Sequence, residues 1–253
     1  TKRGTAMSFK QKCSFLKDII ADSIFPWHTC LLCGKTTYAS SCLCEECSQK
    51  LTNCRRCSEC GCFFNAYTVG DECACCPNCR KEPKRYIDAF YSALPYIDAP
   101  RQRILALKYR GKKKYARPLA KCLAAYLRAQ NVKADYVVAV PLHKNRLEER
   151  GYNQAELLAE IVAEILNIKY LPKALKRHKE TKVQHKLNFE ERKDNLTNAF
   201  SGGSQGAKVK GKTILLVDDI MTSGSTMMNC ALVLKQLGAE KVYAASVASH
   251  LVR

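Results

Sequence analysis

The sequence predicts an α/β protein in which a parallel sheet, with helices on both faces, follows a small cysteine-rich module. Three observations predict this fold. Apolar runs of strand length alternate with helical patterns over residues 81–253, as in parallel sheets with right-handed crossovers. Thirteen of the sixteen cysteines fall between Cys30 and Cys79. One apolar run ends in two adjacent carboxylates, Asp218 and Asp219, which a buried strand does not carry without a reason.

Hydrophobic spacing predicts the elements in chain order. Residues 1–6 are typical of a tag remnant, and Phe9–Ile24 has the apolar spacing of an N-terminal helix. We expect residues 1–29 to hold this remnant and helix, 30–80 the cysteine module and 81–253 the α/β domain. The strands of that domain are expected at Tyr86–Tyr96, Asp135–Val140, Thr213–Val217 and Lys241–Val247, and its helices at Pro100–Tyr109, Tyr115–Ala129, Gln154–Leu166 and Ser225–Leu237.

Four pairs of cysteines share the C-x2-C spacing that lets two thiolates of one tight turn bind a tetrahedral metal ion. These pairs are Cys30/Cys33, Cys44/Cys47, Cys57/Cys60 and Cys76/Cys79. We predict two structural zinc sites of four cysteines each, most simply formed by the first two pairs and by the last two. An interleaved arrangement is also open. Cys54 stands at the same spacing from Cys57, and Cys73 from Cys76, so Cys54 can replace Cys60 and Cys73 can replace Cys79.

The alternative for the cysteines is a disulfide framework of the kind found in secreted proteins. No signal peptide is predicted, because Lys10, Lys12 and Lys17 interrupt the apolar residues that follow Met7. No apolar run is long enough to span a membrane. We therefore expect zinc rather than disulfides, and a cytoplasmic location.

Basic residues are concentrated in one segment of the chain. The formal net charge is +19, and residues 80–118 carry twelve Lys or Arg against three acids. Such a segment is typical of surfaces that contact a polyanion. We predict that Lys112, Lys113 and Lys114 contact single-stranded nucleic acid. The alternatives are a merely solvated surface and a loop that serves only the phosphates of a small ligand.

The residues after the acid pair are typical of a phosphate-binding turn. They are Thr222, Ser223, Gly224, Ser225 and Thr226, and they open the helix that begins near Ser225. Hydroxyls and the amides of a helix N-terminus favour an anion. Carboxylates would repel a phosphate, so Asp218 and Asp219 must face sugar hydroxyls or a Mg²⁺ ion bound to them. The combination predicts a phosphorylated ribose as ligand. Simple N-capping by Ser223 or Ser225 leaves the two acids unexplained.

A second group of candidate residues follows the strand that ends at Val140. Pro141 and Leu142 come directly after this strand, Arg146 stands downstream, and Arg150, Asn153 and Gln154 surround the start of the next helix. Arginine forks and a helix N-terminus suit a pyrophosphate. Ligands of parallel sheets bind beyond the carboxyl ends of the strands, so we expect both groups to face one crevice.

The segment Val217–Thr226 resembles the phosphoribosyl pyrophosphate (PRPP) signature of type I phosphoribosyltransferases. Together with the cysteine pairs, two further motifs resemble the ComF/GntX family of phosphoribosyltransferase-like proteins, from about Cys30 to the C-terminus. The first motif is R-G-Y-N-Q at residues 150–154. The second comprises Gln184, Asn188, Arg192, Asn195 and Phe200.

This resemblance implies a type I phosphoribosyltransferase-like fold and a PRPP site. Asp218 and Asp219 would hold the ribose hydroxyls with Mg²⁺, and the following loop would take the 5-phosphate. Pro141 and Leu142 lie where the family has its pyrophosphate loop, and Lys108 and Tyr109 match a lysine-rich hood over the site. Tyr152 is expected to pack at the start of a helix.

The resemblance also implies a role in natural transformation, in which the protein processes incoming single-stranded DNA beside a ComFA-type helicase and recombination mediators. Thr222 occupies the place of the aspartate that serves purine-salvage members as proton acceptor, so no catalytic residue is predicted. One alternative is a metabolic phosphoribosyltransferase that acts on a small base or amine. Another is a metal-stapled scaffold that only docks a helicase.

Overall fold

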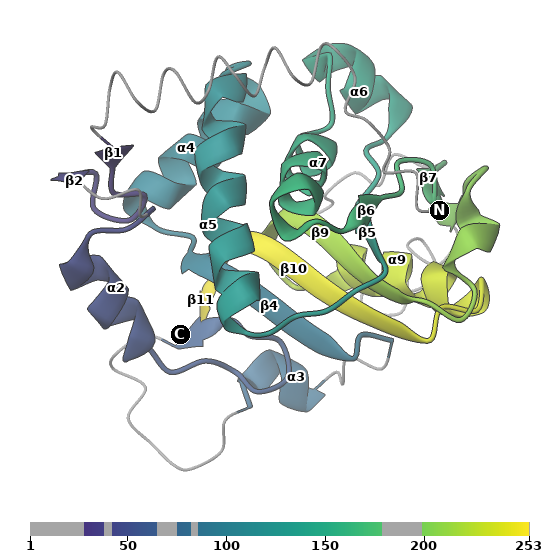
Figure 1. Cartoon of the computed structure of the whole chain (residues 1–253), viewed down its shortest axis with the longest axis horizontal. Coiled ribbons are helices and arrows are strands. Elements are labelled where there is room, and N and C mark those ends of the chain that lie inside the picture. The colour runs from purple at the N-terminus through teal and green to yellow at the C-terminus, as the bar shows by residue number, and fades with distance from the viewer. Residues whose placement is uncertain (1–27, 38–41, 65–74, 82–85, 179–198, 253) are drawn as a thin grey trace, which may run out of the picture.

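The computed structural model describes residues 28–37, 42–64, 75–81, 86–178 and 199–252 (Figure 1). The expected helix Phe9–Ile24 and the motif residues Gln184 to Asn195 lie outside these ranges. Among the described helices, none combines the length and the apolar character needed to cross a bilayer.

Five parallel strands form the central sheet, which confirms the predicted fold class. In spatial order they are β4 (Ala89–Pro95), β10 (Lys241–Ser249), β9 (Thr213–Met221), β5 (Tyr136–Ala139) and β6 (Lys169–Tyr170). The residues Ile214 to Val217 of β9 are all fully buried. This continuous apolar run is what a strand needs when layers of structure cover both of its faces.

Helices α5 (Ala116–Ala129) and α7 (Gln154–Leu166) pack together over one face of the sheet (Figure 1). The other face is covered by α9 (Ser225–Gln236), against which the hairpin of β7 (Leu175–Arg177) and β8 (Phe200–Gly202) packs. The short helix η2 (Gly206–Val209) connects this hairpin to β9. Helix α7 connects β5 to β6, and α9 connects β9 to β10, so these two connections run in opposite directions across the sheet. Because both crossovers are right-handed, the two helices lie on opposite faces. Helix α4 (Asp98–Tyr109) and the short helix η1 (Lys113–Tyr115) join β4 to α5.

The cysteine-rich module lies beside β4 and is joined to the body of the protein (Figure 1). It consists of β1 (His28–Thr29), β2 (Thr36–Thr37), α2 (Glu45–Thr52), β3 (Phe63–Phe64) and α3 (Pro77–Lys81). The C-terminal strand β11 (Leu251–Val252) pairs in parallel with β3. Leu31 and Phe63 of the module are buried in the main core, so the module shares the core of the α/β body.

The short elements β6, β7, β8, η1 and η2 were not predicted, and two further differences concern the site. Strand β9 does not end at Val217 but continues to Met221, because β10 pairs with it as far as Ser249. The acid pair therefore lies within the strand, past the last residue that pairs with β5. A short helix, α6 (Lys144–Arg150), also lies where the sequence pattern predicts none. It ends at Gly151, whose φ of +73° lies in the left-handed region that glycine tolerates.

Candidate functional site

The acid pair lies at the point where the strand order of the sheet reverses. From β5 the chain goes to β6 on one side and returns to β9 on the other. The Val140 amide donates to the Val217 carbonyl, which is the last backbone contact between these strands before the chains diverge. A crevice at such a switch point is where parallel sheets bind ligands. Pro141 and Leu142 follow β5 directly and are partly buried at this position.

Lys108 neutralises part of the charge of the acid pair. Its Nζ lies 2.8 Å from Asp219 Oδ1, and Asp219 is only 3% exposed. The Asp219 amide donates to Asp218 Oδ1 at 2.8 Å. Lys108 is in the last turn of α4, so this ion pair fastens α4 over the carboxyl end of β9. Lys108, which the resemblance assigns to a hood over the site, thus has a carboxylate as its partner in this structure.

The charges of these three groups depend on one another. Burial raises the pKa of Asp218 to about 8, and repulsion from Asp219 acts in the same direction. Burial by itself would lower the pKa of Lys108, but Asp219 and Asp218 raise it above its ordinary value. Asp218 therefore keeps a proton at neutral pH while Lys108 keeps its charge. A cation or a set of hydrogen-bond donors at Asp218 would allow this carboxyl group to ionise.

The loop after the acid pair leads into the N-terminus of α9. Thr222 and Ser223 are exposed, and Gly224 has a φ of +79°. The Ser223 and Ser225 hydroxyl oxygens lie 2.8 Å apart, and the Ser225 amide donates to Ser223 Oγ at 3.4 Å. Hydroxyls and helix amides thus converge directly beside two carboxylates. This is the arrangement that the sequence predicts for a phosphorylated sugar.

Asn153 and Gln154 lie at the start of α7, and both are more than nine-tenths buried. Asn153 accepts a hydrogen bond from the Ala155 amide and donates one to the Val140 carbonyl, both at 3.0 Å. Its amide group therefore fastens α7 to the end of β5. The buried Nε2 of Gln154 and Nε of Arg150 make no hydrogen bond within the described part of the chain. Buried donors of this kind are costly unless a ligand or water satisfies them.

The R-G-Y-N-Q motif packs against the end of α4, a contact that spacing along the chain did not reveal. The Tyr152 hydroxyl donates to the Leu107 carbonyl, and Tyr152 is buried, as expected for a packing residue. The Arg150 guanidinium lies 4.8 Å from the Tyr109 ring centroid, and Lys113 Nζ lies 4.8 Å from that of Tyr152. Arg146 is on α6, four residues before Arg150. Tyr109 is 65% exposed and had no separate binding role in the sequence analysis.

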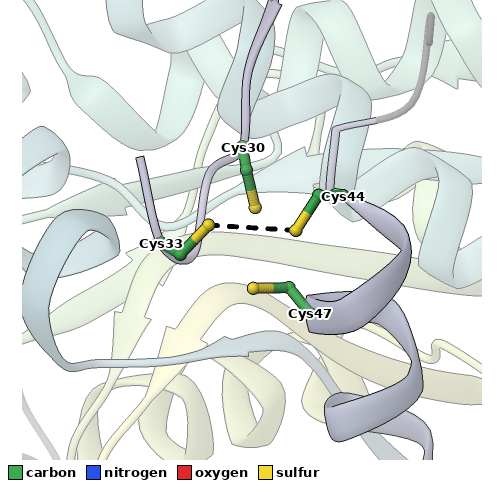
Figure 2. A group of neighbouring side chains, drawn as sticks. All are labelled: Cys30, Cys33, Cys44 and Cys47. Carbon is green, nitrogen blue, oxygen red and sulfur yellow. Dashed lines mark hydrogen bonds between the residues drawn. The ribbon is translucent and has the colours of Figure 1, made fainter. Parts of the chain in front are cut away.

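The first cysteine cluster brings together the first two C-x2-C pairs, which is the simplest of the predicted pairings. Cys30 and Cys33 come from the turn after β1, while Cys44 precedes α2 and Cys47 lies in it (Figure 2). The Sγ atoms of Cys33 and Cys44 are 3.8 Å apart, and all four Sγ atoms lie within 4.8 Å of one another. A tetrahedral ion with bonds to sulfur of about 2.3 Å spaces its sulfurs by about 3.8 Å, so the thiols fit zinc.

The second cluster repeats this geometry with Cys57, Cys60, Cys76 and Cys79, all buried. Gly61 follows Cys60 with a φ of +64°, and the Gly61 amide donates to the Cys57 carbonyl. In the first cluster, Gly34 follows Cys33 with a φ of +77°, and the Gly34 amide donates to the Cys30 carbonyl. The two first pairs therefore form the same kind of turn. Cys54 is exposed and belongs to neither cluster, and Cys73 lies outside the described residues. Cys62 is a fifth buried thiol whose Sγ lies 3.1 Å from that of Cys60.

Comparison with known proteins agrees with the family resemblance and with the phosphoribosyltransferase-like domain. The phosphoribosyl transferase domain family matches residues 150–253. Competence protein F of Haemophilus influenzae is 30% identical over 221 residues, a match that spans 84% of this chain and 93% of that protein. The DNA utilization protein YhgH of Escherichia coli K12 is 27% identical over 221 residues, spanning 85% of this chain and 88% of the relative.

Solved structures of related folds match more distantly. A crystal structure of adenine phosphoribosyltransferase is 17% identical with a TM-score of 0.37, over 57% of this chain and 74% of that one. The allosteric regulatory enzyme of purine biosynthesis is 20% identical with a TM-score of 0.38, over 53% of this chain and about a quarter of that enzyme (26%).

The fold and the site define a type I phosphoribosyltransferase-like protein that carries two four-cysteine clusters. More narrowly, the chain belongs to the ComF/GntX family, because its similarity to competence protein F extends over most of this chain.

Elemental analysis of the purified protein is expected to find about two zinc ions per chain, because each ion needs four thiolates. Cys44→Ser should lose about one ion. Cys54→Ser, which removes an exposed thiol outside both clusters, should keep both. Acid should release the metal, since protons compete for the thiolates. A parent protein with less than one bound ion would contradict the assignment.

The raised pKa of Asp218 predicts a pH-dependent stability of the ligand-free protein. Between about pH 4 and pH 8 the folded state holds a proton that the unfolded state has lost, so stability falls as the pH rises. Asp218→Asn should therefore be more stable than the parent by about 1–3 kcal/mol at pH 8, with little difference near pH 4. Denaturant titrations at both pH values measure this. Glu240→Gln, an exposed change before β10, should show no such difference, and an Asp218→Asn protein less stable at pH 8 would refute the assigned protonation.

Proposed function

We propose that this chain binds PRPP with Mg²⁺ and handles incoming single-stranded DNA in the cytoplasm during natural transformation. The observation that carries the PRPP assignment is the pair of carboxylates, Asp219 buried and Asp218 partly buried, beside a hydroxyl-lined helix N-terminus at the switch point of the sheet. The relatives named competence protein F and DNA utilization protein support the DNA part. By family resemblance, a ComFA-type helicase and recombination mediators are the partners.

The proposed site assigns a separate part of PRPP to each group of residues. Asp218 and Asp219 take the ribose hydroxyls and Mg²⁺. The charge of the ion and the hydrogen bonds from the hydroxyls together let Asp218 ionise. The loop from Thr222 to Thr226 takes the 5-phosphate through amides and hydroxyls. Once Asp219 binds the ligand, Lys108 is free to turn toward the phosphates.

The pyrophosphate part of PRPP is assigned to the other side of the crevice. We assign this part to Arg146, Arg150 and the segment Pro141–Leu142. The unsatisfied Nε2 of Gln154 and Nε of Arg150 support the assignment, because they are donors suited to phosphate oxygens. Thr222 has no proton that titrates near neutral pH, so the chain offers no general base at this position. We therefore propose that the site binds PRPP, and measurement of pyrophosphate release tests whether a phosphoribosyl group is also transferred.

The nucleic-acid part of the proposal rests on a surface next to this crevice. Lys112, Lys113 and Lys114 are exposed on and before η1. Tyr109, whose ring is exposed, ends α4 three residues before Lys112, with Arg150 against it. Lysines that track a phosphate backbone and an aromatic ring that stacks on a base are the two parts of a sequence-tolerant single-strand site.

The double substitution Asp218→Asn with Asp219→Asn should weaken PRPP binding about a hundredfold or more, because each charge-assisted hydrogen bond contributes about 1.5–3 kcal/mol. Isothermal titration calorimetry in the presence of Mg²⁺ measures the affinity. Glu240→Gln provides the control and should bind like the parent. Unchanged affinity in the double variant would show that the ribose does not bind at these carboxylates. Release of pyrophosphate on addition of a base or amine would favour the metabolic alternative.

Replacing Lys112, Lys113 and Lys114 together by Ala should weaken single-stranded DNA binding and flatten its dependence on salt. The log–log slope should fall by up to about two units, since each phosphate neutralised contributes about 0.7. The matched control replaces Lys208, Lys210 and Lys241, which are exposed near the amino ends of β9 and β10 at the opposite edge of the sheet. Loss of PRPP affinity without loss of DNA affinity would instead assign the lysines to the small ligand.

A further inference from the structure

The second cysteine cluster contacts the strand that carries the acid pair. Its buried thiols form one apolar cluster with Met221, which is 4% exposed, and Phe64 and Phe90 pack against this cluster. Met221 is the last residue of β9, so the next residue in the chain is Thr222 of the loop. A buried side chain with its own packing partners restricts the backbone on either side of it. The loop therefore starts from a residue that the cluster holds.

A backbone connection reaches the same residue by a different route. Strand β3 begins at Phe63, directly after Cys62, and pairs with β11. Between β10 and β11, the His250 amide donates to the Met221 carbonyl at 3.2 Å. Both the side chain and the carbonyl of Met221 are thus fastened to structure that includes the second cluster.

The first cluster is attached to a different part of the protein. Leu31, which lies between Cys30 and Cys33, is buried in the main core. Arg103 of α4 donates to the Leu31 carbonyl at 2.6 Å and to Thr29 Oγ1 at 3.3 Å. Arg103 precedes Lys108 by more than one helical turn, and α4 is also held by the fully buried Ile104 and Leu107. Loss of the first cluster should therefore disturb the phosphate loop much less than loss of the second.

We propose that metal binding at the second cysteine cluster positions Met221 and, through it, the loop of residues 222–226, so that the order of this loop depends on the second cluster and not on the first. Four buried thiolates repel one another without a cation, and thiols that lose the metal no longer need to converge. The packing of the cluster's cysteine side chains against Met221 would then loosen. The consequence for PRPP affinity rests on the proposed function, whereas the ordering of the loop does not.

Hydrogen–deuterium exchange in the ligand-free protein tests this inference with a matched pair of variants. Cys57→Ser and Cys30→Ser change the same position of the same kind of turn, one in each cluster, and each should lower the metal content by about one ion. Amides of residues 222–228 should exchange at least tenfold faster in Cys57→Ser, and within about twofold of the parent in Cys30→Ser. Equal exchange in the two variants would overturn the inference.

Met221→Ala tests the connection without touching a metal ligand. It should keep two metal ions and still speed exchange of the loop, and unchanged exchange would overturn the inference as well. PRPP titration of Cys57→Ser should then show an affinity at least tenfold weaker than that of the parent. If the parent itself binds no PRPP, the proposed function fails, while the exchange experiments still decide whether the cluster positions the loop.

Discussion

The charge balance between Lys108 and the carboxylates of Asp218 and Asp219 is the interaction on which the candidate site depends. Two acids on successive residues of a buried strand are unfavourable unless their charge is compensated. Here the compensation comes from a lysine on α4 at 2.8 Å and from a proton that burial keeps on Asp218. The site is therefore formed by two elements about 110 residues apart in the chain, α4 and β9, and it is complete only when α4 lies over the end of β9.

The same need for a cation explains how the site can accept a ligand. A group that brings positive charge or hydrogen-bond donors to the acid pair replaces what Lys108 and the proton supply, so the carboxylates favour ligands of that chemistry. The contact of Tyr152 with Leu107 holds the end of α4 against the start of α7. As a result, the exposed Tyr109 at the end of α4 and Lys113 of η1 both lie against the R-G-Y-N-Q segment, Tyr109 at Arg150 and Lys113 at Tyr152.

The cysteine-rich module is more closely joined to the body than its sequence suggests. Eight thiols in two clusters stabilise short strands and a two-turn helix that contain few apolar residues. The module nevertheless shares the main core through Leu31 and Phe63 and shares a sheet with the C-terminus through β3 and β11. Of the two clusters, the second contacts β9 through Met221 while the first contacts α4 through Arg103. Each side of the candidate site is thus in contact with one cluster.

The sequence by itself determined the fold class, the acid pair and the C-x2-C pairs of cysteines, because each depends on local chemistry: apolar periodicity, charge in a buried strand, and the spacing of a tight turn. Which pairs share a cluster, and that Cys54 belongs to neither, only the tertiary structure decided. The sequence did not predict the end of β9, since pairing with β10 beyond Val217 is a property of the sheet. Helix α6 was missed because seven residues carry too little periodicity. Only the tertiary structure decided that Lys108 faces Asp219, that Tyr152 holds α4, and that Met221 lies among the cysteines. These contacts join segments that are distant in sequence. They depend on how the helices and strands pack, and no local sequence pattern contains that information.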